Sequence, residues 1–190
     1  MIVIRKFVFA LFKVLNAIVL KMNKVHYGKI VIEGIVLVHN KGTFRIADRA
    51  KINSSRFKNI IGGDTRSSFV VKKNASLIIG ENFKISNSAI YCAERIEIGD
   101  NVMIGGSCKI WDSDFHPLNH ESRLANPNEE YVTRPIRIHN NVFIGGCSII
   151  LKGVTIGEGS IIGAGSVVSR DVPAGEIWAG NPAVFIKKTT

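Results

Sequence analysis

The sequence is poor in cysteine, and its three cysteines follow no pattern that would suggest a shared structural task. Cys92, Cys108 and Cys147 are odd in number and include no Cys-x-x-Cys pair, which excludes the disulfide framework of a small secreted domain. We therefore expect reduced thiols, as is usual in a cytoplasmic protein.

Acidic residues are also scarce. The 190-residue chain has 15 of them against 25 lysines and arginines, which gives a formal net charge of +10. Such a balance favours anionic partners, namely nucleic acid, a membrane surface or a polyphosphorylated cofactor. The basic residues form no run with interleaved aromatics, so we expect no nucleic-acid partner. With 46% hydrophobic and 21% charged residues, the composition is that of one folded domain.

No apolar run is long enough to span a membrane. The most apolar stretch, residues 1–24, is interrupted by Lys13 and Asn16, and no signal-peptide cleavage site follows it. At about 100° per residue its polar side chains fall on one stripe. These are Arg5, Lys6, Lys13, Asn16, Asn23 and Lys24. We predict that residues 1–26 form a basic amphipathic helix, which either binds an anionic membrane surface or packs on this protein's body or a neighbouring subunit.

Helical periodicity is absent after His26, and a six-residue repeat takes its place. The longest run of aliphatic residues at this spacing is Ile138, Ile144, Ile150, Ile156, Ile162 and Val168. Shorter runs are Ile98, Ile104 and Ile110, then Ile79, Ile85 and Tyr91, and finally Ile46 and Ile52. A period of six fits short strands joined by tight corners that glycine permits. Because stacked coils of this kind bury a continuous aliphatic column, we predict an all-β solenoid over residues 27–172.

Two segments depart from the repeat. Residues 112–135 are rich in proline, asparagine and acidic residues. A long excursion loop within a compact domain usually has a function. The repeat stops at Pro173, so residues 173–190 are expected to form a short C-terminal tail.

Two long segments of the sequence resemble a known family. IGDNVMIGGSCKIWDSDFHPLN and PIRIHNNVFIGGCSIILKGVTIGEGSIIGAGSVVSRDVPAGEIWAGNPAVFIKK are similar to the hexapeptide-repeat O-acetyltransferases, which include maltose, galactoside and polysaccharide acetyltransferases. The resemblance covers roughly residues 75–188. It implies a left-handed parallel β-helix with three hexads per coil, a homotrimer, and active sites between neighbouring subunits.

The same resemblance implies transfer of an acetyl group from acetyl-CoA, as co-substrate, to a sugar hydroxyl. The segment IWDSDFHPLN is most similar to the enzymes that modify surface polysaccharides, such as capsule, O-antigen or exopolysaccharide. Such a protein is expected in the cytoplasm, where the N-terminal helix could give it a peripheral position at the inner face of the membrane. We expect no metal.

Acetyl transfer needs a base for the hydroxyl, a donor that polarises the thioester carbonyl, and alignment of both substrates. Histidine suits the role of base because its protonation changes near neutral pH. His116, in Asp-Phe-His-Pro, matches the family's catalytic histidine. Asp112 or Asp114 would orient its ring or bind the acceptor, or would instead be a turn-forming residue that bonds its own backbone. The matching oxyanion donor is the backbone N–H of Gly146.

Other positions match the family's binding groove for acetyl-CoA. Phe143, Ala164, Gly165 and Ser169 match positions along the pantetheine arm, although Phe143 would equally suit core packing. Arg170 and Lys187 are the nearest matches for residues that bind the CoA phosphates. The family often carries arginine where this sequence has Val184, and Lys152 or Lys188 would then substitute. Acceptor contacts are expected on loops and on the weakly patterned early coils.

Three other functions stay open. The related γ-type carbonic anhydrases bind zinc through three histidines, for which His116, His120 and His139 are candidates. An acetyltransferase of the xenobiotic or serine type would use another hydroxyl or an amine as acceptor. A non-catalytic β-helix would serve only as a scaffold. The Phe-His-Pro-Leu-Asn context and the Gly-Asn-Pro-Ala element favour a transferase.

Overall fold

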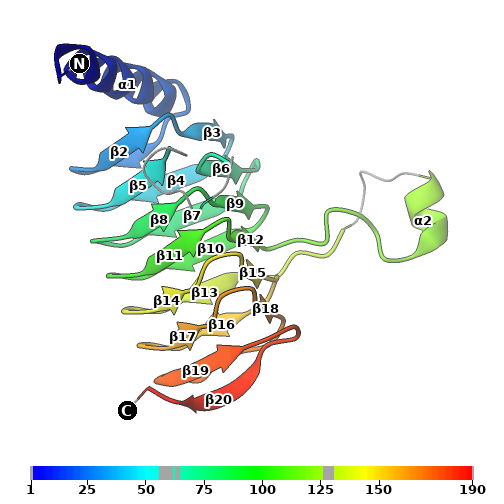
Figure 1. Cartoon of the computed structure of the whole chain (residues 1–190). Helices are drawn as coiled ribbons and strands as arrows, with labels where there is room; N and C mark the ends of the chain where they lie inside the picture. The colour runs from blue at the N-terminus through cyan, green and yellow to red at the C-terminus, as the bar shows by residue number, and fades with distance from the viewer. Residues whose placement is uncertain (1, 56–61, 63–64, 126–130, 190) are drawn as a thin grey trace.

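The computed structural model describes residues 2–55, 62, 65–125 and 131–189. The chain winds into stacked coils, and each regular coil contributes one strand to each of three parallel sheets (Figure 1). The three sheets form the faces of a solenoid, with helix α1 at one end and the strand pair β19–β20 at the other.

We name the sheets A, B and C in the order in which each coil visits them. Sheet A contains β1 (His26–Tyr27), β4 (Thr43–Ile46), β7 (Ser76–Ile79), β10 (Arg95–Ile98), β13 (Ile136–Ile138) and β16 (Thr155–Ile156). Sheet B contains β2 (Val31–Gly34), β5 (Lys51–Ser54), β8 (Lys84–Ser86), β11 (Met103–Gly106), β14 (Phe143–Ile144), β17 (Ile161–Ile162), β19 (Glu176–Ala179) and β20 (Val184–Lys188). Sheet C contains β3 (Leu37–Asn40), β6 (Ser68–Val71), β9 (Ala89–Cys92), β12 (Lys109–Trp111), β15 (Ile149–Ile150) and β18 (Val167–Val168).

The six-residue repeat sets the register between coils. In the last coils, strand partners are three hexads apart in sequence. The pairs are Ile138 with Ile156, Ile144 with Ile162, and Ile150 with Val168. All six side chains are buried, because alternate residues of a strand point to opposite faces and one face lines the interior. The predicted solenoid and its aliphatic column are confirmed.

The repeat predicts the wrong inward residue in one coil. Stepping by six leads to Tyr91, yet the buried side chains of β9 are Ile90 and Cys92, and Tyr91 faces outward. The cause is a register shift in sheet B just before this strand. Tyr91 packs instead on Phe115 of the loop after β12, with ring centroids 4.7 Å apart.

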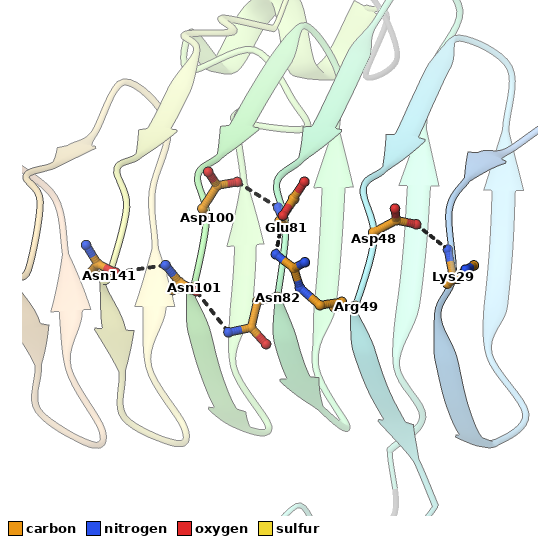
Figure 2. Close-up of polar contacts among 8 residues, drawn as sticks. All are labelled: Lys29, Asp48, Arg49, Glu81, Asn82, Asp100, Asn101 and Asn141. Carbon is orange, nitrogen blue, oxygen red and sulfur yellow. Dashed lines mark hydrogen bonds and ion pairs between the residues drawn. The ribbon is translucent and has the colours of Figure 1, made fainter.

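Side-chain ladders hold the corner between sheets A and B (Figure 2). Asn82, Asn101 and Asn141 occupy equivalent places in successive coils with φ of 53°, 57° and 61°, a left-handed conformation that asparagine tolerates well. The Asn82 amide donates to Oδ1 of Asn101 at 2.9 Å, and the Asn101 amide donates to Oδ1 of Asn141 at 3.1 Å. Beside this ladder, Asp100 accepts the N–H of Glu81 at 2.7 Å. Asparagine thus serves at this corner in the role that glycine has at other corners.

Helix α1 (Ile2–Met22) covers the N-terminal end of the solenoid and contacts β2 and β3 (Figure 1). Its inner side holds Leu20 and Asn16, each 3% exposed. The Asn16 side chain donates to the carbonyl of Gly34 at 2.9 Å and accepts the N–H of Val36 at 3.1 Å. Packing against the protein's own body, one of the two roles left open by the sequence, is therefore present. No helix in the described residues is long and apolar enough to cross a bilayer.

The segments outside the repeat contain regular structure of their own. We call residues 112–135 the arm. It leaves the solenoid after β12 and carries helix α2 (His120–Ala125) away from the body (Figure 1). The expected C-terminal tail contains a strand pair, in which β19 pairs in parallel with β17 and β20 folds back antiparallel on β19. This pair extends sheet B, and Val172 and Ala183 at this end of the core are buried.

Candidate functional site

Sheet B has a strip without side chains that runs along the solenoid axis. After the buried isoleucines of β11, β14 and β17 come Gly105, Gly145 and Gly163. A Cβ on Gly105 would lie 2.5 Å from the Gly146 nitrogen, and one on Gly145 would lie 2.5 Å from the Ala164 nitrogen. The close stacking of the coils therefore requires glycine here. Beside the strip, Phe143 is 41% exposed and is not a core residue.

Gly146 lies at the corner between sheets B and C, directly after this strip. Its carbonyl accepts the N–H of Gly165 at 2.8 Å, whereas its own N–H has no acceptor among the residues that the structure describes. Ala164 and Gly165 lie at the same corner in the next coil and are exposed. A Cβ on Gly165 would point into open space. These three predicted residues thus form one surface of small residues with an available N–H donor.

His116 lies on the arm and is exposed. The preceding residue, Phe115, has a φ of 64°. Its ring centroid is 4.7 Å from that of Tyr91 and 5.9 Å from that of Trp111. This aromatic cluster anchors the base of the arm and so fixes where His116 emerges. It was not predicted, although aromatic residues at outward strand positions next to a loop are a readable signal.

One chain does not bring His116 and Gly146 together. Gly146 precedes the sheet C strand β15 and lies at the corner with sheet B, whereas His116 follows the sheet C strand β12 at the corner with sheet A. The width of sheet C separates the two residues. A site that uses both therefore needs a second chain, which agrees with the arrangement that the resemblance implies.

Asp112 joins two successive coils of the solenoid. It is fully buried, and its carboxylate accepts the backbone N–H groups of Ala93, Glu94 and Arg95 at 2.6 to 2.8 Å. Hydrogen bonds to a charged acceptor are the stronger kind, and here they engage both oxygens. Asp112 thus bonds the corner of the preceding coil, and not its own backbone as a turn-forming residue would.

Asp114 pairs with Lys152 across the base of the arm. One carboxylate oxygen lies 2.6 Å from the lysine Nζ, and the other oxygen is buried without a partner in the described part of the chain. The Asp114 N–H donates to the carbonyl of Val132 at 3.0 Å, which joins the two ends of the arm. The ion pair engages Lys152, one of the alternatives considered for the CoA phosphates.

The remaining residues predicted to bind CoA are exposed but lie in two places. Ser169 and Arg170 follow β18 in sheet C. Lys187, with Lys188 beside it, is in β20 at the end of sheet B, where Lys187 pairs with Ile177. Within one chain these basic residues are not neighbours.

The three histidines considered as zinc ligands lie in two parts of the chain, and two of the cysteines are buried. His116 and His120 are on the arm, and His139 follows β13. In the described ranges, no three histidine, cysteine or carboxylate side chains are placed to hold a metal ion. Burial raises the pKa of the Cys92 and Cys108 thiols, which keeps them from the reactive thiolate form.

Comparisons with known proteins agree with this geometry. The family described as bacterial transferase hexapeptide (six repeats) matches residues 135–170. The chain is 36% identical over 162 residues to "Putative acetyltransferase YJL218W" of Saccharomyces cerevisiae, which covers 82% of this chain and 80% of that protein. It is 40% identical over 115 residues to galactoside O-acetyltransferase of Escherichia coli, which covers 60% of this chain and 55% of that enzyme. The match thus spans about half of the length of the latter.

A solved structure with a similar fold is the hexapeptide-repeat-containing acetyltransferase VCA0836 of Vibrio cholerae O1 biovar eltor, in complex with acetyl coenzyme A. Its TM-score is 0.58 at 26% identity, over 92% of this chain and 75% of that chain. The solenoid described above is a left-handed parallel β-helix. Its hand is an exception to the usual right-handed crossover between parallel strands.

The contacts of Asp112 generate a prediction that separates structure from catalysis. In Asp112→Asn, an amide NH2 replaces one oxygen of the buried carboxylate, so that backbone N–H groups of residues 93–95 lose their charged acceptor. We expect the free energy of unfolding to fall by about 2–3 kcal/mol, because hydrogen bonds to a charged group contribute roughly this much. Asp114→Asn, which removes a partly exposed ion pair, should cost about 1 kcal/mol or less.

Urea unfolding of both variants at one protein concentration measures the difference. An Asp112→Asn protein that is as stable as the parent but has lost its activity would return this residue to the catalytic machinery.

Proposed function

We propose that this chain, which belongs to the hexapeptide-repeat acetyltransferases and is an acetyl-CoA-dependent acyltransferase, acetylates a hydroxyl group of a sugar. The observation that carries the proposal is the Gly146 N–H, which lies beside an exposed surface of small residues. The similarity to galactoside O-acetyltransferase supports a sugar acceptor. The similarity of the arm to polysaccharide-modifying enzymes supports a role in surface-polysaccharide synthesis.

In the proposed reaction, His116 takes the proton of the sugar hydroxyl as its oxygen attacks the thioester carbonyl. The Gly146 N–H donates to the carbonyl oxygen, where negative charge develops. The tetrahedral intermediate then collapses, the carbon–sulfur bond breaks, and the CoA sulfur leaves with the proton that His116 returns. General-base help of this kind typically contributes about 10²–10⁴ in rate.

Donor binding follows from the small residues near Gly146. Ala164 and Gly165 let the pantetheine arm lie close to the backbone, with Phe143 and Ser169 beside it. Arg170 and Lys187 would supply positive charge to the CoA phosphates. Because these two residues lie at different places in one chain, we propose that neighbouring subunits each contribute one of them.

A homotrimer is part of the proposal. His116 and Gly146 are at opposite edges of sheet C, so the active site would combine the arm of one subunit with the glycine corner of the next. A three-sided solenoid suits threefold packing, because each subunit then offers one edge and receives another. The Asp114–Lys152 ion pair, 2.6 Å long, would hold the arm at the angle that this contact requires.

Peripheral contact with an anionic membrane at the inner face is the last part of the proposal. Apolar side chains on α1 remain 36–77% exposed although the helix packs on the first coil. They are Leu11, Val14, Leu15, Ile18 and Met22. No acidic residue occurs before Glu33, so the region combines apolar area with positive charge. Interfacial helices bind membranes through this combination.

We expect the protein to have about three times the mass of the 20.8-kDa chain in solution. The reason is that the proposed site needs residues from two subunits, and a closed cyclic trimer completes every site. Static light scattering at micromolar concentration measures the mass. A stable monomer with full activity would exclude an active site shared between subunits.

His116→Ala should lower kcat by about a hundredfold or more, because the base is lost. Binding of CoA should stay within about threefold of the parent, since the imidazole makes no contact that the proposed donor site needs. Steady-state kinetics and calorimetric titration with CoA measure the two effects. His120→Ala, on the same arm, is the matched control and should retain activity. Parent-like turnover in His116→Ala would rule out this base.

The full-length protein should sediment with phosphatidylglycerol vesicles at low salt and much less at high salt, since each basic residue near the surface contributes about 1 kcal/mol. The double variant Val14→Asp/Ile18→Asp should lose this binding, because both side chains lie on the exposed apolar side of α1. Leu124→Asp, an exposed apolar site on the arm, is the control. Failure of the unmodified protein to sediment at low salt contradicts the membrane contact.

A further inference from the structure

On the N-terminal side of Gly105, the strip on sheet B has side chains in place of glycines. Its floor there consists of the half-buried side chains of Ser86 and Asn53. Its wall consists of Phe143 and Met103 beside the glycines, and of Lys84 and Lys51 in the coils nearer the N-terminus. This upper half is a shallow groove of about 390 Å³, a size that suits one or two sugar rings.

The groove is continuous with the proposed acetyl-transfer site. Gly105 lines the groove and also stacks so closely on the next coil that a Cβ there would lie 2.5 Å from the Gly146 nitrogen. Phe143, beside the expected pantetheine position, lines it as well. A molecule in the groove would therefore have one end next to the Gly146 N–H, where the acetyl group is transferred.

The charge of the groove comes from Lys84 and Lys51. These residues are register partners on neighbouring strands of sheet B, so two like charges point outward side by side, an arrangement that is unfavourable on its own. Lys51 has the carboxylate of Glu33 at 3.9 Å. Lys84 has no carboxylate within ion-pairing distance in the part of the chain that the structure describes. An anion bound between the two ammonium groups would remove the repulsion.

We propose that the acceptor is an anionic sugar, whose carboxylate or phosphate binds Lys84 and Lys51. Asn53 and Ser86, on the floor of the groove, hydrogen-bond its ring hydroxyls, and the hydroxyl that is acetylated faces Gly146. This inference rests on the proposed acetyl transfer and adds the class of acceptor. The lysines lie on the N-terminal side of Gly146, whereas Arg170 and Lys187, matched to the CoA phosphates, lie on its C-terminal side. The groove is therefore assigned to the acceptor and not to the donor.

The test compares three acceptors with one ring: glucose, glucuronic acid and glucose 6-phosphate. For the full-length protein, KM for at least one anionic sugar should be about tenfold or more below KM for glucose, as expected for a charge-assisted contact. Lys84→Ala should remove this advantage and leave KM for acetyl-CoA and for glucose unchanged. Lys73→Ala, an exposed lysine after β6 in sheet C, is the control.

Calorimetric titration of the same sugars in the presence of CoA gives Kd without turnover and separates this inference from the reaction. A preference for the anions that Lys84→Ala abolishes supports the groove assignment even if no sugar is acetylated, a result that would count against the transfer reaction alone. The comparison of Kd for glucuronic acid with Kd for glucose 6-phosphate shows whether a carboxylate or a phosphate is bound. Equal KM and Kd for glucose and both anions, or a Lys84→Ala protein in which only KM for acetyl-CoA rises, overturns the proposal.

Discussion

The interior column of β-branched side chains is the constraint on which the other features depend. Burial of each isoleucine contributes about 1.5–3 kcal/mol relative to exposure, and this holds only if successive coils superimpose. The run from Ile138 to Val168 meets the condition at every step. Once the inward positions coincide, the outward positions must coincide as well. The asparagine ladder in Figure 2, the glycine strip on sheet B and the paired lysines all follow from this one registration.

The same rigidity limits what one chain can do chemically. Strands of sheet C separate Gly146 from the base of the arm, and a packed column does not bend to bring the two edges together. The arm is the one long departure from the coils in the described residues, and its base is anchored by the rings of Phe115, Tyr91 and Trp111. In the proposed reaction, His116 on this arm acts on a neighbouring subunit, so that assembly would be part of the active site.

The sequence was most informative where the local pattern and the fold agree. From Ile98 to Val168 the hexads predict the inward residues correctly, with a single interruption by the arm, because every step satisfies both strand alternation and corner geometry. The prediction fails at Tyr91, where a register shift in the neighbouring sheet moves the frame by one residue. No local pattern contains that information. The repeat does not predict the strands of the C-terminal tail for a related reason, since β20 is held by antiparallel pairing with β19.

In the candidate site too, the sequence predicts the residues whose places are set by the local repeat and misses those whose contacts depend on the fold. The small residues Gly146, Ala164 and Gly165 were predictable because their positions are fixed by the repeat and by the resemblance. Asp112 was not, since its sequence neighbours suggest the arm while its carboxylate bonds the corner of the preceding coil. The lysine pair was not predicted either, because Lys51 and Lys84 become neighbours only through the register of β5 and β8.

The order of features along sheet B gives the two substrates a direction. Strand β2 contacts α1, and the strands below it in Figure 1 are β5 and β8 with the lysines, then β11 and β14 with the glycine strip, and finally β20 with Lys187. With strands about 4.8 Å apart, the distance from β2 to β11 is roughly 15 Å. If acceptor and donor occupy the two halves of this strip, they approach Gly146 from opposite ends and do not compete for space. A sugar carried on a membrane lipid would then enter from the end that α1 covers, and the apolar side of that helix is the part of the molecule best suited to face the lipid.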